Sequence, residues 1–235
     1  MNRQRKPKCL IALSVFIALW TARSAVSQCT NQITVVPLHP VKAASRARDF
    51  VRFKYALTAS DSLLIRSHED TETSIGPYDT GFEIVRDGKA LRNVALRNVR
   101  GFRREEPEYS ESFTTLAIAR ACARESLIYF VTMQYMGDLT SPALTFVVVP
   151  SSDGYEITSL PMISGGVIDV SKADPRHIRT WDNLHEGNCE ACETAYEITD
   201  YEIRGGKPIR VRTQRTKRLY QSGEFDDRRR IRFIP

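Results

Sequence analysis

One stretch near the C-terminus decides the fold expected for this chain. It reads Tyr196-Glu-Ile-Thr-Asp-Tyr-Glu-Ile-Arg204, then Gly205-Gly206, then Lys207-Pro-Ile-Arg-Val-Arg-Thr-Gln214. The first arm alternates with a period of two, which is typical of a strand with two usable faces. The paired glycines can take the positive φ angles of a type I′ turn. The stretch therefore predicts a β-hairpin.

The second arm of this hairpin also alternates. Strict alternation places Ile209 and Val211 on one face and Arg210 and Arg212 on the other. The hairpin is thus expected to present one basic face.

Similar patterns recur along the chain. Gly81–Val99 predicts an earlier hairpin with Asp87-Gly88 at its turn. The alanines of Thr114–Glu125 suit a helix, but its alternation and its neighbours favour a strand. Turns are expected at Asp61-Ser62 and Asp182-Asn183. The other expected strands are Phe50–Leu57, Leu63–Arg66, Leu127–Tyr135, Leu144–Val149, Tyr155–Leu160, Gly166–Val170 and His177–Trp181.

About ten short strands with turns between them indicate an all-β protein. We expect an antiparallel meander arranged as a sandwich or as partial propeller-like sheets. The near repeat of Tyr155-Glu-Ile-Thr158 at Tyr196-Glu-Ile-Thr199 fits internal repetition, and it also fits unrelated hairpins of similar composition.

The N-terminus has the three parts of a secretory signal peptide. Basic residues precede the apolar run Leu10–Trp20, and the small-residue site Ala25-Val-Ser27 follows it. We expect cleavage after Ser27, with an uncleaved anchor as the alternative. Residues 28–235 then form a single exported domain, periplasmic or extracellular, with 28–125 and 126–235 as its conceivable halves.

The charge of the chain depends largely on this leader. The whole sequence has 34 Lys and Arg against 28 Asp and Glu. Residues 1–27 hold five basic residues and no acidic one, which leaves 29 against 28 and a net charge of +1. The high pI therefore does not indicate nucleic-acid binding. No later apolar run is long enough to span a membrane.

Basic residues gather in the last part of the chain. From Arg204 onward there are eleven Lys and Arg against three acids. This excess suits a docking surface for an anionic macromolecule, a protein or a glycan, and it also suits an edge strand protected by its charges. The expected binding residues are Arg204, Lys207, Arg210, Arg212 and Arg215.

Four cysteines remain after the leader: Cys29, Cys122, Cys189 and Cys192. An even number in an exported protein predicts disulfides, with three connectivities open. His185 with the last two cysteines offers three ligands of a zinc site, but no second Cys-x-x-Cys completes it. We expect no metal and no cofactor.

Part of the chain resembles a known family. Gly137-Asp138-Leu139, the strand ending at Val149, Asp153-Gly154-Tyr155 and the later Tyr-x-Ile strands are similar to blade repeats of the FG-GAP or VCBS kind. The resemblance covers about residues 127–215 and implies propeller-type blades of an exported bacterial protein. The calcium loop of that family is not found in the sequence.

One cluster of residues offers an enzymatic alternative. A hydrolase acting on a glycan or ester would use a carboxylate and an imidazole within reach of its substrate. The residues for this in the 169–192 region are Asp169, Asp174, His177, Trp181, Asp182 and His185. Turn composition also explains them, and no nucleophile-elbow, metalloprotease or phosphate-loop motif occurs. We therefore expect a non-catalytic binding module, with a structural envelope component as a further option.

Overall fold

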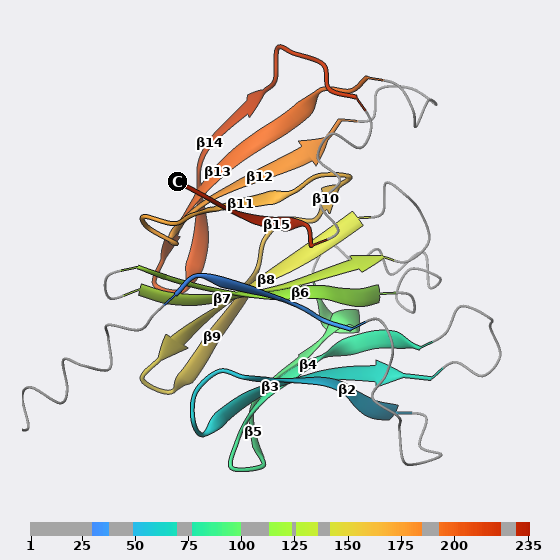
Figure 1. Cartoon of the computed structure of the whole chain (residues 1–235), viewed down its shortest axis with the longest axis vertical. Helices are drawn as coiled ribbons and strands as arrows, with labels where there is room; N and C mark the ends of the chain where they lie inside the picture. The colour runs from blue at the N-terminus through green and yellow to red at the C-terminus, as the bar shows by residue number, and fades with distance from the viewer. Residues whose placement is uncertain are drawn as a thin grey trace, which may run out of the picture. The chain divides into compact units, whose positions relative to one another are not determined.

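Fifteen β-strands and no α-helix make up the regular structure of the described residues, which confirms the all-β prediction (Figure 1). All the strands lie in the unit that runs from Asn31 to Pro235. Neighbouring strands pair antiparallel except for one parallel pair. The computed structural model describes residues 30–37, 49–69, 77–99, 113–123, 126–135, 142–184, 193–221 and 229–235.

The strands form three sheets. The central sheet contains, in order, β1 (Gln32–Val35), β6 (Phe113–Ala123), β7 (Ser126–Tyr135), β8 (Pro142–Ser151) and β10 (Ile163–Ser164), with β9 (Gly154–Ser159) also pairing with β8. The N-terminal sheet contains β2 (Asp49–Ala56), β3 (Asp61–His68), β4 (Tyr78–Arg86) and β5 (Lys89–Ala95), and the 3-10 helix η2 (Leu96–Asn98) follows it. The C-terminal sheet contains β14 (Lys207–Arg215), β13 (Tyr196–Arg204), β12 (His177–Asn183), β11 (Ile168–Ser171) and β15 (Ile231–Ile234).

The central sheet is buried on both faces. One face packs against the N-terminal sheet, where the rings of Phe82 on β4 and Phe146 on β8 meet edge to face at 5.2 Å. The other face packs against the C-terminal sheet, where the alanines of β6 share a core with Ile178 of β12. A strand covered on both sides must be apolar at nearly every position, which explains the long apolar run of β7. The sandwich therefore has three layers.

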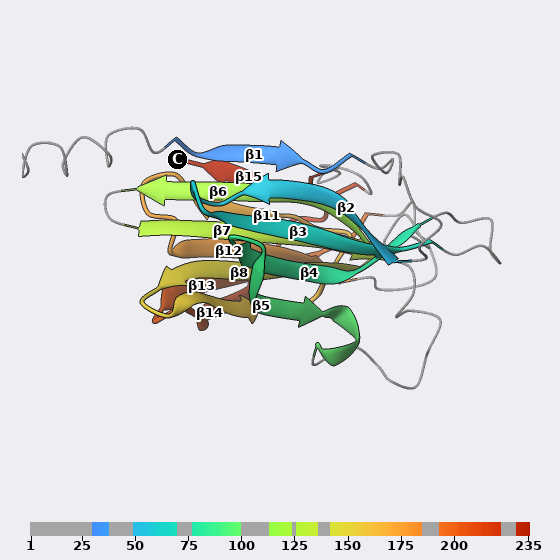
Figure 2. The same ribbon diagram turned by 90° about the horizontal axis from the view of Figure 1, so that it is seen from below.

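The two cores also account for the ambiguous alanine-rich segment. The structure confirms a strand at Phe113–Ala123. Ala117, Ala119 and Ala121 all face the C-terminal sheet, while Ile118 faces the N-terminal sheet. Small side chains on one side of β6 suit close packing against its neighbours. Figure 2 shows β1 beside β6 at one edge of this sheet.

Both predicted hairpins are present. Gly205 and Gly206 have φ angles of 53° and 73° in the turn between β13 and β14. Asp87 and Gly88 have 48° and 78° between β4 and β5. Two consecutive left-handed residues define the type I′ turn, whose twist matches that of the flanking strands.

Several local predictions were wrong. Asp61-Ser62 begins β3 and Asp182-Asn183 ends β12, so neither pair is a turn. Asp61 lies in a strand because its buried carboxylate is bound by Arg86 of β4, at 2.7 and 3.0 Å. The short strands β1, β10 and β15 were not expected, because each has too few residues to show a period.

The sheets draw on both halves of the chain. β6 and β7, on either side of residue 125, pair from Phe113–Tyr135 to Ala123–Ser126.

Among the residues described, no helix is long and apolar enough to cross a membrane. The expected leader, residues 1–27, lies outside the described residues.

Candidate functional site

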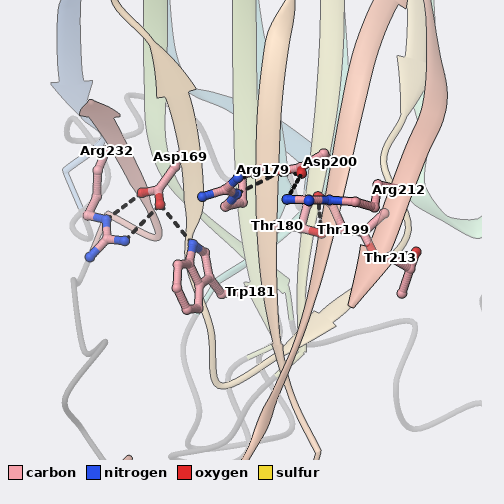
Figure 3. Close-up of polar contacts among 9 residues, drawn as sticks. All are labelled: Asp169, Arg179, Thr180, Trp181, Thr199, Asp200, Arg212, Thr213 and Arg232. Carbon is pink, nitrogen blue, oxygen red and sulfur yellow. Dashed lines mark hydrogen bonds and ion pairs between the residues drawn. The ribbon is translucent and has the colours of Figure 1, made fainter. Parts of the chain in front are cut away.

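A row of alternating charges crosses the whole C-terminal sheet (Figure 3). Its members lie directly opposite one another on five neighbouring strands, from β15 at one edge to β14 at the other. In order they are Arg232, Asp169, Arg179, Asp200 and Arg212. We call this row the charge ladder. Opposite charges facing each other across neighbouring strands stabilise a sheet.

The ladder lies on the outer face of the sheet. Its neighbours along the strands, Ile178 on β12 and Tyr201 on β13, belong to the core shared with the central sheet. Successive side chains of a strand point to opposite faces, so Arg179 and Asp200 point away from that core. The outer face is thus defined by the same alternation that builds the core.

Asp169 holds one end of the ladder. Its carboxylate accepts two hydrogen bonds from Arg232, at 2.5 and 2.9 Å, and one from the indole nitrogen of Trp181 at 2.8 Å. Trp181 packs edge to face against Tyr196 and Tyr220, with ring centroids 6.4 and 6.3 Å apart. The ion pair and the aromatic cluster therefore support each other.

Asp200 holds the other end. It accepts hydrogen bonds from Arg179, at 2.7 Å, and from Arg212, at 3.2 Å. Burial alone would raise the pKa of Asp200, but the hydrogen bonds and positive charges of these two arginines lower it below its ordinary value. The hydrogen bond to Asp200 in turn raises the pKa of Arg179. Asp200 and Arg179 are therefore both charged near neutral pH.

The acidic groups of the ladder lie deeper than the basic ones. The Asp169 side chain is 4% exposed, whereas that of Arg212 is 57% exposed. Arginine is long and carries its charge at its tip, so the guanidinium groups reach solvent while the carboxylates stay below them. A partner that approaches this face meets cations first.

A β-bulge divides the predicted basic face in two. The pairing of β13 with β14 shifts between Asp200 and Tyr201, which leaves Val211 as the extra residue. Arg212 lies opposite Asp200 on the outer face, but Arg210 lies opposite Tyr201, which faces the core side. The prediction that Arg210 and Arg212 share a face was therefore wrong, because a bulge breaks strict alternation.

The other expected binding residues lie at the two ends of β14. Arg204 and Lys207 flank the turn, and Arg204 donates to Glu202 at 2.6 Å. Arg215 lies opposite Glu197 at the far end of the strand. The five residues therefore share one hairpin but do not form a single face.

The tip of this hairpin rests on β9. The hydroxyl of Thr158 donates to the carbonyl of Gly206 at 3.0 Å. The side chain of Glu156 occupies the space where a Cβ of Gly206 would lie, 1.9 Å from its Oε2. These contacts hold one end of β14 against the central sheet.

The described residues of the enzymatic alternative meet only in pairs: His177 Nδ1 lies 3.3 Å from Asp174 Oδ2, and the indole of Trp181 donates to Asp169. His177 and Asp182 lie on opposite faces of β12, since five positions separate them along the strand. Asp182 accepts a hydrogen bond from the Ser164 backbone at 2.6 Å. Asp174 is bound by Arg176, whose hydrogen bonds lower the pKa of the carboxyl to about 2. The described members of this cluster therefore do not gather at one place: Asp174, beside His177, is also held by Arg176, while Asp182 lies on the other face of β12.

Of the four cysteines predicted to form disulfides, only Cys122 lies among the described residues. Cys122, near the end of β6, is buried and disulfide-bonded. Cys29, Cys189 and Cys192 lie outside the described residues, as does His185, so the pairing stays a prediction. Within the described ranges, no group of three or more His, Cys, Asp or Glu could hold a metal ion.

Of the five ladder residues, sequence reasoning named only Asp169 and Arg212 as candidates for a site. Arg232 reaches Asp169 only because β15 joins β11 as a parallel strand from 63 residues away. The one available signal was the alternation of Arg230 and Arg232 with Ile231 and Phe233. Such a short pattern does not identify its partner strand.

Comparisons with known proteins add no relationship. No family model, no curated protein and no solved structure matches this chain. The resemblance of residues 127–215 to FG-GAP or VCBS blades therefore stays a prediction, and the described strands form stacked sheets with no propeller among them.

Proposed function

We propose that this protein is an exported, non-catalytic binding module that recognises an anionic macromolecule through the C-terminal sheet. The recognition surface is the outer face of that sheet together with its edge strand β14. Export rests on the leader pattern of residues 1–27.

One observation supports this proposal above all others. β14 is nine residues long, eight of them are exposed, and it carries four cationic side chains and no acidic one. Exposed cations at the edge of a sheet attract an anionic partner and raise its rate of association. The ladder arginines extend this cationic surface across the outer face.

The arrangement of the described acids and histidines favours binding over catalysis. Each carboxylate of the 169–182 segment is already bound by an arginine or a backbone N–H group. A general base must instead be free to reach a substrate proton.

A charge-reversal experiment tests the proposal. The double variant Lys207→Glu/Arg210→Glu changes two exposed residues of β14. Its matched control is Lys54→Glu/Lys89→Glu in the N-terminal sheet, because both lysines are exposed and Lys89 also follows a type I′ turn. Both variants change the net charge equally.

The measurement is the binding of poly-L-glutamate and of heparin to the purified protein at low salt. We expect the β14 variant to bind at least one polyanion about tenfold more weakly, which corresponds to roughly 0.7 kcal/mol for each reversed charge. The control should bind as the unchanged protein does. Equal loss in both variants would show a non-specific charge effect and would refute β14 as the recognition surface.

A further inference from the structure

The outer edge of β14 is open to an added strand. β14 pairs with β13 on one side only, and no described strand pairs with its outer edge, because β14 ends the order of the C-terminal sheet. Val211 is 61% exposed and Ile209 is 43% exposed. The edge strands β1 and β15 have only four residues each, whereas β2 and β5, at the edges of the N-terminal sheet, have eight and seven against the nine of β14. Unpaired backbone groups at a sheet edge are a template for another chain.

The direction of the backbone groups on β14 follows from one hydrogen bond. The N–H of Thr216 donates to the carbonyl of Tyr196 on β13 at 2.9 Å. Along an antiparallel strand, residues alternate between bonding to the neighbour and pointing away from it. Gln214 therefore bonds to β13, and the N–H and C=O groups of Thr213 point outward. A partner backbone can reach them there.

The position of Pro208 agrees with an exposed edge. Lys207 closes the two-residue turn opposite Arg204, and Pro208 is the next residue along β14. The same alternation turns the nitrogen of Pro208 outward, where the missing N–H costs β13 no hydrogen bond. Proline in a sheet is confined to such edge positions.

The positive charge of β14 indicates which kind of strand can pair with its outer edge. A second copy of β14 would bring arginines and lysines opposite one another, which destabilises a strand pair. An acidic strand would place carboxylates opposite these cations instead. A glycan offers no regular ladder of amide donors and acceptors, so the exposed backbone favours a polypeptide.

We propose that β14 accepts an extended, acidic segment of a partner protein as an additional strand of the C-terminal sheet. This inference rests on the proposed function, because it specifies how the same surface binds. Backbone hydrogen bonds supply the regular contacts, and Lys207, Arg210 and Arg212 select for acidic residues. Ile209 and Val211 provide apolar contact next to the cations.

A proline substitution separates strand addition from charge attraction. Thr213→Pro removes an outward N–H and leaves the charge of β14 unchanged. Thr213→Val is the matched control, because it keeps the N–H and the β-branched shape. Each variant loses the hydrogen bond between the Thr213 and Thr199 hydroxyls, so this loss cancels in the comparison.

The probe is a synthetic peptide of the same length as β14, in which glutamate alternates with threonine. Its dissociation constant is measured by isothermal titration calorimetry for the purified full protein and each variant. We expect Thr213→Pro to bind about three- to tenfold more weakly than Thr213→Val, as the loss of one or two backbone hydrogen bonds predicts. Circular dichroism checks that both variants keep their strands.

A modified peptide provides a second measurement that needs no protein variant. N-methylation of alternate backbone amides removes donors from the probe but keeps its charge. If the methylated peptide and the unmodified peptide bind the unchanged protein equally well, strand addition is wrong. If neither binds at all, strand addition is also wrong.

The results also distinguish this inference from the proposed function. Loss of peptide binding in Lys207→Glu/Arg210→Glu, with full binding in Thr213→Pro, would keep the cationic surface and overturn strand addition. Full binding in both of these variants would overturn strand addition and the proposed surface together. Loss in Thr213→Pro and with the methylated peptide is the result we expect.

Discussion

Replacing Asp79 with alanine should remove a large part of the stability of this protein. The Asp79 carboxylate on β4 accepts hydrogen bonds from Arg52 of β2 at 2.5 Å, from Ser67 of β3 at 2.6 Å and from the backbone of Thr115 on β6 at 2.5 Å. Both side chains of the ion pair are almost completely buried. The group therefore joins the N-terminal sheet to the central sheet.

The magnitude follows from what the substitution leaves behind. Arg52 would keep only neutral acceptors, the Thr114 hydroxyl at 3.1 Å and the Thr115 carbonyl at 3.2 Å. Burial already lowers the pKa of Arg52, and Asp79 is the charge that opposes this shift. Leaving one partner of a buried ion pair uncompensated costs about 3–5 kcal/mol. The whole free energy of unfolding of a folded domain is only about 5–15 kcal/mol.

Equilibrium unfolding in urea measures this loss. A change of about 3–5 kcal/mol should lower the midpoint by about 1–2 M or more, given typical slopes of about 1–3 kcal/mol per M. The matched control is Asp49→Ala on the same sheet, where the carboxylate is 84% exposed and pairs with His68. An exposed pair contributes about 0–1 kcal/mol, so the control should unfold close to the unchanged protein.

A double variant tests the physical reason. In Arg52→Met/Asp79→Ala neither charge remains, so the double variant should be more stable than Asp79→Ala alone. The reasoning fails if Asp79→Ala shifts the midpoint no more than Asp49→Ala does. It also fails if the effects of the two single substitutions simply add.

Two further predictions concern the hairpin tip and acid stability. Gly206→Ala should destabilise the protein by about 2–4 kcal/mol and Gly205→Ala by only about 1 kcal/mol. Both residues have left-handed backbone angles, but only the methyl group added at Gly206 would collide with Glu156. Urea unfolding of the two variants, each with and without Glu156→Ala, checks this. The ionised carboxylate of Asp61 should stabilise the fold above about pH 4, and this stabilisation should be lost as the pH falls towards 2. The reason is that hydrogen bonds from Arg86 lower the pKa of Asp61 to about 2. The difference in free energy of unfolding between the unchanged protein and Asp61→Asn, from urea unfolding between pH 5 and 2, measures this loss.

Each of these has an outcome that contradicts it. If Glu156→Ala stabilises Gly205→Ala as much as Gly206→Ala, the contact at the hairpin tip is not the cause. If the stability difference between Asp61→Asn and the unchanged protein stays constant down to pH 2, the carboxylate of Asp61 does not gain its stability from Arg86.

The predictions that succeeded from sequence concern neighbouring residues. The turns at Gly205-Gly206 and Asp87-Gly88 depend on the φ angles of two residues each, and the strands beside them depend on local alternation. Long apolar runs such as Leu127–Tyr135 were identified as core strands for the same reason. The five residues expected to bind a partner lie on one hairpin but not on one face, and their role in binding stays a prediction.

The predictions that failed depend on distant partners. The bulge at Val211 arises from how β14 pairs with β13, and alternation within one strand cannot show it. Asp61 was assigned to a turn because acids are common in turns, yet Arg86 and Tyr155 hold it in a strand across 25 and 94 residues. Charges buried by such long-range contacts leave no local pattern.

The sequence by itself determined the class of this fold: period-two alternation, β-branched and aromatic runs, and glycine turns specify short strands, because these signals act within a few residues. Only the tertiary structure decided which strands became neighbours. It brought Arg232 opposite Asp169, buried Arg52 against Asp79 and left β14 at an edge. Those contacts depend on how the three sheets pack against one another, and this packing involves residues far apart in the sequence.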